Sequence, residues 1–327
     1  MKRYSISITI LYCVIYKMEQ DKYRKAVREQ SIKDILTTWR TPRNLFGPLS
    51  KFVRRNINDL EILLELFPNK PWSWEYIAEN PNTTLKFIQS HPNIPWNFTW
   101  LSFNPNITWN ILRNNRDKDW NWRFLSENPN ITLNIVRKNP KKPWDWHYLS
   151  KNPSVTWDIV QKNPKEPWEW WALSQNPNIT WEIVQSNPDK PWSWYGISKN
   201  PHITMDIIEN NLDKPWNWDG LSQNPNITWE FVQNNIEESW DWKLLSKNPG
   251  ITWDVIQNNL DIPWNWEFVS ENPSITWDIV QSNPDMPWNW EHLSMNPSIT
   301  WEIVYDNRDK PWNWTGLSRN KFQMGLL

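Results

Sequence analysis

Residues 167–190 read Pro-Trp-Glu-Trp-Trp-Ala-Leu-Ser-Gln-Asn-Pro-Asn-Ile-Thr-Trp-Glu-Ile-Val-Gln-Ser-Asn-Pro-Asp-Lys, and this 24-residue pattern recurs without insertion or deletion. Ten full copies fill residues 71–310, and residues 311–320 repeat its first ten positions once more. A fixed period of this length is typical of solenoids, in which each unit buries apolar side chains against its neighbours. We number the positions of the repeat 1–24, with Pro167 at position 1.

The first half of the repeat has the pattern of a short helix that begins after position 3. That position is Ser, Asn or Asp in ten of eleven copies, with Glu169 as the exception. Such side chains cap helices by accepting hydrogen bonds from free backbone N–H groups. Trp168 and Leu173 have the spacing of a hydrophobic staple around this cap. Asn176 and Pro177 then end the helix after about two turns.

The second half predicts another short helix, capped by the Thr at position 14, which is present in all ten full copies. Ile179 and Val184 have the spacing of a second staple. Position 16 is acidic in seven of ten copies, which suits the positive end of a helix dipole. Asn187 recurs in nine of ten copies, and we expect it to end the helix in a left-handed backbone conformation.

Strands are the alternative, because Trp, Ile, Val and Thr are good strand formers. Hairpin turns favour Gly, however, and the chain has only 6 glycines, whereas its turns are Asn-Pro. The sequence therefore predicts an all-α chain, an α-solenoid of tandem 24-residue two-helix repeats with an N-terminal helical cap. The pattern does not fix the curvature of the superhelix.

Most of the 31 tryptophans occupy three periodic sites, at positions 2, 4 and 15. Helices of two turns are not stable alone, and a covered Trp ring buries on the order of 150–250 Å², so we expect the periodic rings to form the core. Exposed rows of rings for sugars, bases or proline-rich peptides are the alternative. Leu85, Leu133 and Met205 replace Trp at position 15, so we expect this site to be the most open.

An Asn recurs at position 10 in all eleven copies. Buried Asn side chains satisfy backbone groups, so we expect a structural ladder along the stack rather than a row of ligand-binding groups. Asn-Ile-Thr triplets at Asn106, Asn130, Asn178 and Asn226 match the glycosylation pattern, which we interpret as incidental because the Thr is assigned to a cap.

The charge divides the chain into a basic beginning and an acidic remainder. Residues 1–56 hold 13 Lys or Arg and 4 Asp or Glu, and the remainder holds 22 and 32. An acidic solenoid is a poor non-specific binder of nucleic acid. We favour a solvated capping helix for the basic segment. Contact with RNA, an acidic lipid or an acidic partner is the alternative.

Four segments are expected: a short apolar leader (1–18), a basic helical cap with a degenerate half-repeat (19–70), ten full repeats (71–310) and a terminal half-repeat with a tail (311–327). Residues 6–16 are too few for a membrane span. The leader is consistent with a weak signal sequence, a β-strand or an untranslated extension before Met18, and we favour the last two. Residues 59–67 match the second helix of a repeat in register.

Cys13 is the only cysteine, which excludes a disulfide framework and a cysteine metal cluster. The four histidines occupy four different repeat positions and pair with no recurring carboxylate: His91, His147, His202 and His292. The acidic residues at helix starts complement helix dipoles, and no perturbing pocket is indicated around them. We therefore expect no enzyme activity, no metal and no cofactor.

The stretch Asn-Pro-Asn-Ile-Thr-Trp-Glu-Ile-Val-Gln-Ser-Asn-Pro-Asp-Lys-Pro-Trp-Ser-Trp (176–194) resembles tryptophan-rich tandem repeat proteins of giant double-stranded DNA viruses of the mimivirus kind. The resemblance covers about residues 71–320 and leaves residues 1–56 outside it. It implies a viral origin, expression in an infected protist and location in the host cytoplasm or the virion. No catalytic residue can be transferred from it.

A repeat scaffold for protein–protein interaction is the function we expect, with a host or virion protein as the partner. Because the recurring positions hold the stack, specificity is expected at variable positions: Tyr76, Trp171, Tyr195, Asp219, His292, Lys190 and Glu237. A carbohydrate or nucleic-acid reader that uses exposed Trp rings, and a purely structural virion component, are the alternatives.

Overall fold

The computed structural model describes residues 59–322, which belong to two compact units with a boundary between Lys70 and Pro71. In the first unit, the described residues contain one helix, α5 (Asp59–Leu66). This helix covers the stretch that the repeat register assigns to a second helix. The predicted leader and most of the predicted basic cap lie outside the described residues.

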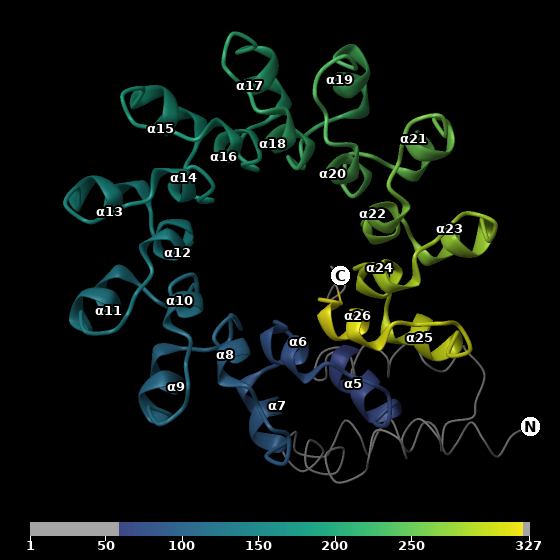
Figure 1. Cartoon of the computed structure of the whole chain (residues 1–327), viewed down its shortest axis with the longest axis horizontal. Helices are drawn as coiled ribbons and strands as arrows, with labels where there is room; N and C mark the ends of the chain where they lie inside the picture. The colour runs from purple at the N-terminus through teal and green to yellow at the C-terminus, as the bar shows by residue number, and fades with distance from the viewer. Residues whose placement is uncertain (1–58, 323–327) are drawn as a thin grey trace, which may run out of the picture. The chain divides into compact units, whose positions relative to one another are not determined.

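The second unit consists of short helices in two layers. Figure 1 shows an inner circle of helices with a second set outside it, and the chain alternates between them. The inner helices are α6 (Trp74–Glu79), α8 (Phe98–Leu101), α10 (Trp122–Leu125), α12 (Trp146–Lys151), α14 (Trp170–Leu173), α16 (Trp194–Ser198), α18 (Trp218–Ser222), α20 (Trp242–Ser246), α22 (Trp266–Glu271), α24 (Trp290–Met295) and α26 (Trp314–Arg319). The outer helices are α7 (Leu85–Ser90), α9 (Trp109–Asn114), α11 (Leu133–Lys138), α13 (Trp157–Lys162), α15 (Trp181–Ser186), α17 (Met205–Glu209), α19 (Trp229–Asn234), α21 (Trp253–Gln257), α23 (Trp277–Ser282) and α25 (Trp301–Asp306). Residues 59–322 contain no strand, so the predicted all-α architecture of two-helix repeats is confirmed.

The inner helices begin where the sequence predicts. The side chain at position 3 accepts a hydrogen bond from a backbone N–H in every inner helix except α14, where Glu169 makes none. In α18, for example, Asn217 Oδ1 accepts from the N–H of Gly220 at 2.8 Å. Such a cap stabilises a helix by about 1 kcal/mol, which matters for helices too short to form alone.

The outer helices also start after the predicted Thr, but they end differently from the prediction. Asn187 has φ −135° and ψ 57°, so the predicted left-handed conformation is wrong. Its Nδ2 instead donates to the carbonyl oxygen of Ile183 at 2.8 Å, and its own carbonyl oxygen accepts from Trp192 Nε1 at 2.9 Å. The amide side chain thus satisfies the helix end, and no left-handed residue is needed.

The periodic Trp rings pack edge to face across consecutive repeats. The ring of Trp170 lies 5.1 Å from that of Trp192 at 83°. The Trp157 ring, two repeats before Trp192, lies 5.7 Å from it in a tilted arrangement. Every ring at positions 2, 4 and 15 is buried or half-buried in the described residues, so the prediction that these rings form the core is confirmed. The expectation that position 15 is the most open is wrong. Four of its seven Trp rings are buried: Trp181, Trp253, Trp277 and Trp301. Trp181 and Trp277, for example, each contact Trp rings of the two following repeats.

The Asn residues at position 10 form the predicted ladder. Asn176 Nδ2 donates to the main-chain oxygens of Ser150 and Asn152 at 2.8 and 3.0 Å, and its Oδ1 accepts from the N–H of Asn178 at 2.8 Å. The side chain of Asn178 in turn donates to the main-chain oxygen of Pro153 at 2.8 Å. These amides therefore satisfy the backbone of the preceding repeat.

A second ladder runs through the Ser residues at position 8, which are all buried. Ser174 Oγ donates to the carbonyl oxygen of Trp170 at 2.8 Å and accepts from the N–H of Ser193 at 2.8 Å. Ala78 occupies this position in the first repeat and carries no hydroxyl. Each Ser thus joins its own helix to the start of the next inner helix.

The last half-repeat contacts the first repeat through the same bonds. The N–H of Ser73 donates to Ser318 Oγ at 3.0 Å, and Asn80 Nδ2 donates to the main-chain oxygens of Ser318 and Asn320, each at 2.9 Å. Helices α26 and α6 are therefore neighbours, and Figure 1 shows the inner circle closed. The second unit is a closed ring, called the repeat ring below (described residues 71–322).

Closure gives each inner helix two neighbours. The ring of Trp72 lies 4.9 Å from that of Trp314 at 78°, as neighbouring repeats pack Trp against Trp elsewhere. In a linear stack the terminal repeats expose apolar surface unless they are capped. Here the inner layer of the first repeat is covered by that of the last half-repeat, a feature that the sequence pattern did not predict.

Candidate interaction face of the repeat ring

The inner helices have one partly exposed face, formed by positions 5, 6 and 9 of the repeat and most open at position 5. In α14 the side chain of Trp171 at position 5 is 45% exposed, whereas Leu173 and Ser174 at positions 7 and 8 are fully buried. Successive helical residues are rotated by about 100°, which places positions 5, 6 and 9 on one side of the helix. Position 6 is half-buried where it carries a large side chain and buried where it is Ala or Gly, as at Ala172 and Gly196. In Figure 1 the outer helices lie outside the inner helices, and each inner helix has an inner helix on either side. We call the side formed by positions 5, 6 and 9 the inner face.

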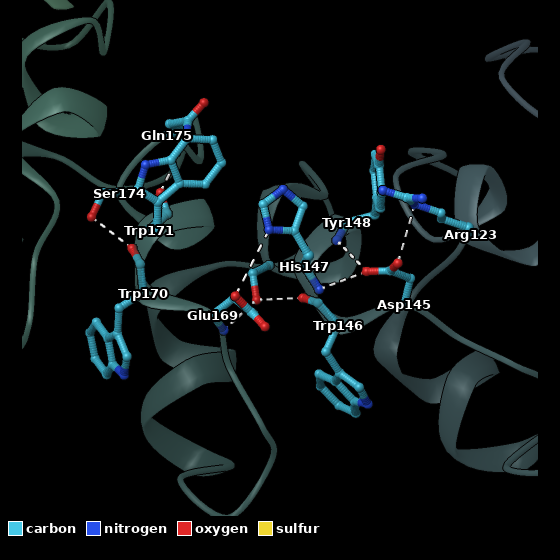
Figure 2. A network of polar contacts seen from close by, with 11 residues as sticks. Arg123, Asp145, Trp146, His147, Tyr148, Glu169, Trp170, Trp171, Ser174 and Gln175 are labelled. Atoms are coloured by element: carbon cyan, nitrogen blue, oxygen red, sulfur yellow. Dashed lines mark hydrogen bonds and ion pairs between the residues drawn. The ribbon is translucent and has the colours of Figure 1, made fainter.

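Adjacent Trp residues on one inner helix point to opposite sides of that helix. Figure 2 shows the ring of Trp170 directed away from that of Trp171, and the ring of Trp146 directed away from that of His147. Trp170 contacts Trp192 in the core. Trp171 belongs to the inner face.

Aromatic side chains form a continuous row along part of the inner face. Consecutive members are in ring contact, with His147 linking Tyr148 to Trp171. Centroid separations range from 3.6 Å between Phe103 and Phe124 to 6.4 Å between Phe124 and Tyr148. This aromatic row consists of Tyr76, Trp100, Phe103, Phe124, Tyr148, Trp171 and Tyr195.

Three parallel rings lie at one end of the row. The His147 ring is 5.3 Å from Trp171 with an interplanar angle of 21°, and Trp171 is 6.3 Å from Tyr195 at 2°. Tyr195 is held from the other side, because its hydroxyl oxygen accepts from Gln223 Nε2 at 2.9 Å. These side chains come from consecutive inner helices, so the repeat itself sets their spacing.

Cationic side chains lie over the rings of the aromatic row. The Arg123 guanidinium is 4.9 Å from the Tyr148 ring centroid, and Figure 2 shows its contact with Asp145. The other cations over the row are Lys151 at 4.7 Å from Trp171, Lys199 at 5.3 Å from Tyr195 and Arg319 at 3.7 Å from Tyr76. Each cation–π contact is worth about 0.5–1 kcal/mol at such partly exposed sites.

The lysines near Trp171 have no carboxylate partner of their own among the described residues, because no ion pair joins Lys151 or Lys199 to any of them. Partial burial lowers the pKa of the Lys151 ammonium group. Glu127 opposes this shift and the positive charge of Lys199 adds to it. An anion near the two amines would be stabilised by both.

The inner face is electrostatically divided. From Thr99 to Lys199, positions 5, 6 and 9 carry three cations, one His and a single carboxylate, Glu127. On the remaining inner helices the same positions carry six carboxylates, namely Glu75, Glu79, Asp219, Glu267, Glu271 and Glu291, against Lys243, Lys247 and Arg319. The aromatic row therefore lies mostly on the basic side of the inner face.

The seven residues predicted to contact a partner fall on two surfaces. Five lie at positions 5 or 6 on the inner helices: Tyr76, Trp171, Tyr195, Asp219 and His292. Lys190 and Glu237 lie instead on exposed turns that follow the outer helices α15 and α19. The seven residues therefore do not form one cluster.

Within the inner set, the structure brings some residues together. Trp171 and Tyr195 stack, and Gln223 Nε2 donates both to the Tyr195 hydroxyl and to the main-chain oxygen of Asp219 at 3.2 Å. His292 lies apart from them, with its Nδ1 at 3.2 Å from Glu271 Oε2. Tyr76 contacts Trp100 edge to face at the other end of the row.

Sequence reasoning missed much of the aromatic row, including Trp100, Phe103, Phe124 and Tyr148. The available signal was the recurrence of aromatic residues at position 6 in the first four repeats and at position 9 in the second. That signal is weak because the aromatic residues recur at these positions in only part of the chain. The sequence alone also did not show which face of the helix positions 6 and 9 occupy.

A second surface carries exposed aliphatic side chains at position 22 of three consecutive repeats. Leu212, Ile236 and Leu260 are 62%, 40% and 54% exposed, where other repeats have Pro or Arg. Glu237 follows Ile236 directly. These residues lie on the turns after outer helices and are separate from the aromatic row.

Residues 59–322 contain no group of three His, Cys, Asp or Glu side chains that is arranged to hold a metal ion. Within that range, none of the helices has the length and apolar character needed to cross a bilayer. Comparisons with protein-family models, with curated protein sequences and with solved structures each gave no match.

Proposed function

We propose that the chain is a non-enzymatic repeat scaffold that binds a protein partner on the inner face of its ring. The observation that carries the proposal is the aromatic row, seven rings on consecutive inner helices that are connected by ring contacts, with His147 linking Tyr148 to Trp171. Exposed aromatic and Arg side chains are enriched where proteins bind one another. Rows of this kind are not needed for the stack, because the remaining inner helices lack one.

The recurring and the variable positions of the repeat differ in burial, and this difference supports the same proposal. Recurring positions are buried and joined by the Asn and Ser ladders. Positions 5 and 9, which are exposed or half-buried, vary between repeats, from Trp171 to Asp219 and from Lys199 to Gln223. A rigid ring that presents different side chains at fixed spacing can bind with little loss of conformational entropy.

The partner is proposed to be a host or virion protein, in keeping with the resemblance to giant-virus repeat proteins. The host cytoplasm or the virion would then be the place of action. Position 22 of the outer turns and the predicted contacts Lys190 and Glu237 would be secondary contacts at most, since no ring contact links them to the aromatic row.

Affinity capture followed by cross-linking mass spectrometry tests the proposal, with the full chain and a Trp171→Asp, Tyr195→Asp variant. Asp already occupies position 5 as Asp219, so the ring accommodates it. We expect the variant to lose proteins that the wild type captures from infected cells. Leu212→Asp, at an exposed outer turn, is the matched control.

Three outcomes would contradict this function. Proteins captured equally by the wild type and the inner-face variant would place the contact elsewhere. Specific retention of glycans or single-stranded RNA, lost in the same variant, would favour the reader of sugars or nucleic acids. Abundant incorporation into virions with no dependence on the inner face would favour a purely structural component.

A further inference from the structure

Four side chains form a compact group on the inner face, contributed by the stretches of α12, α14 and α16. We call this group the lysine–aromatic cluster: Lys151, Trp171, Tyr195 and Lys199. Each lysine ammonium lies over one ring, at 4.7 Å from the centroid of Trp171 and 5.3 Å from that of Tyr195. The two rings are parallel within 2°.

The Trp171 ring is the accessible part of the cluster, and the parallel ring of Tyr195 beside it is half-buried. Trp171 is 45% exposed, whereas every Trp at the three periodic sites of the described residues is buried or half-buried. The edge of the surface is fixed by the hydrogen bond from Gln223 to the Tyr195 hydroxyl. Planar or apolar groups of a ligand gain from covering such rings, because apolar area is removed from water at both surfaces.

The charges of the cluster favour an anionic ligand. The positive charge of Lys199 helps to lower the pKa of Lys151, and neither amine forms an ion pair with a described residue. Partly buried ammonium groups make stronger bonds to carboxylates than fully hydrated ones do. A ligand with carboxylates on both sides of a planar or apolar group would satisfy the lysines and cover the rings together.

A peptide fits this arrangement better than a nucleic acid does. Glu127 lies near Lys151, Asp145 pairs with Arg123, and Glu169 lies 3.9 Å from His147. These carboxylates interrupt the basic surface, and residues 71–327 carry 21 Lys or Arg against 29 Asp or Glu. A continuous phosphate backbone needs an extended basic track, whereas separate acidic side chains need only two anchoring cations.

We infer that the lysine–aromatic cluster is a binding site for an acidic peptide segment of a partner protein. Carboxylates of the segment contact the two lysines, and its aromatic or aliphatic side chains cover the two rings. This inference rests on the proposed function and specifies the chemistry of the partner at one part of the inner face.

The test uses the full chain and a fluorescein-labelled peptide of repeated Glu-Glu-Tyr, followed by fluorescence anisotropy at low salt. A Lys-Lys-Tyr peptide and a single-stranded oligouridylate of equal length are the comparison probes. The test variant is Lys151→Gln, Lys199→Gln, because Gln175 and Gln223 already occupy position 9. Circular dichroism and thermal unfolding verify that the ring is intact.

The matched control variant is Lys243→Gln, Lys247→Gln. Both lysines also lie over one ring of the inner face, at 4.8 and 5.0 Å from the centroid of Phe268, but on the acidic side. We expect the Lys151 and Lys199 variant to bind the acidic peptide about tenfold more weakly, and the control to change affinity by less than about twofold. Binding should weaken with added salt, since the contacts are partly exposed.

Three results would overturn the inference. They are failure of the acidic peptide to bind at concentrations up to about 1 mM, equal binding by the test variant and the wild type, or tighter binding of the basic peptide or the oligouridylate. The proposed function has a separate readout, because cross-linked partners that depend on the inner face would remain if only the acidic chemistry were wrong. Loss of both would reject the two together.

Discussion

Asn80 Nδ2 donates to the main-chain oxygen of Asn320 at 2.9 Å, across 240 residues of sequence. The corresponding bond from Asn176 to Asn152 spans 24 residues and measures 3.0 Å. One interaction therefore both joins adjacent repeats and closes the ring. The closing contact uses residues that every repeat carries, so closure depends on the number and curvature of repeats and not on a specialised sequence.

Replacement of Asn80 by Ala tests closure directly. The change leaves the buried oxygens of Ser318 and Asn320 without their donor, and we expect a loss of about 2–4 kcal/mol in unfolding free energy. Asn176→Ala removes the same kind of bonds inside the stack and should cost a similar amount. Urea unfolding compares the two variants. A loss much smaller for Asn80→Ala than for Asn176→Ala would indicate an open stack.

Much of the fold could be predicted from the sequence because caps and staples are local. For example, the residue type of Asn217 and its place in the repeat are enough to predict that it caps the start of α18. Closure could not be predicted in this way. The angle between repeats is set by how closely the inner helices pack, and that distance depends on contacts such as the approach of Gly196 to Ser174.

The candidate site was only partly predictable for a related reason. Variability identified Trp171 and Tyr195, which the structure brings together, but it also identified Lys190, which lies on an outer turn. Deciding between these surfaces requires knowledge of which layer each half-repeat occupies. The prediction of a left-handed backbone at Asn187 was wrong because the amide side chain of this residue satisfies the helix end by itself.

The Ser ladder predicts a pair of opposite effects. Ser174→Ala removes the acceptor for the N–H of Ser193 and should destabilise the ring by about 1–2 kcal/mol. Ala78→Ser adds the hydroxyl that every other inner helix has at this position, and we expect a gain of about 1 kcal/mol. Thermal unfolding of the two variants measures both changes. The same sign for both would contradict a role of the Ser hydroxyl in joining repeats.

Glu79 on α6 predicts a pH dependence. Burial raises the pKa of this carboxyl above its ordinary value of 4.5, although Arg319 and Lys321 oppose the shift. A carboxyl whose pKa is raised on folding costs stability when it is ionised, and this cost disappears as the pH falls and the group is protonated. Glu79→Gln should therefore raise the melting temperature at neutral pH and have little effect well below pH 4.5.

Glu182 is the control for Glu79, because its pKa is shifted in the opposite direction. A hydrogen bond from Thr180 lowers the pKa of its carboxyl, so the ionised group contributes stability that is present above the ordinary value of 4.5 and lost as the pH falls. Glu182→Gln should lower the melting temperature slightly at neutral pH and have no effect in acid. Melting curves recorded between neutral and acidic pH distinguish the two variants. If the difference in melting temperature from the wild type changed with pH in the same direction for both variants, the opposite pKa shifts of Glu79 and Glu182 would be contradicted.

Trp170 and Trp171 predict the sharpest contrast between core and surface. Trp170 packs at 5.1 Å from Trp192, and its replacement by Ala should cost about 3–5 kcal/mol, as expected for a large core ring. Trp171→Ala should change the unfolding free energy by no more than about 1 kcal/mol, because the ring is 45% exposed and loses only its contacts to His147, Tyr195 and Lys151. Iodide quenching of the tryptophan fluorescence is an independent measurement. Trp171→Ala should reduce the fraction of the fluorescence that iodide can quench more than a substitution of any core Trp that leaves the repeat ring folded. A variant of Trp171 as unstable as that of Trp170 would show that the aromatic row supports the ring, and would remove the reason to assign it to a partner.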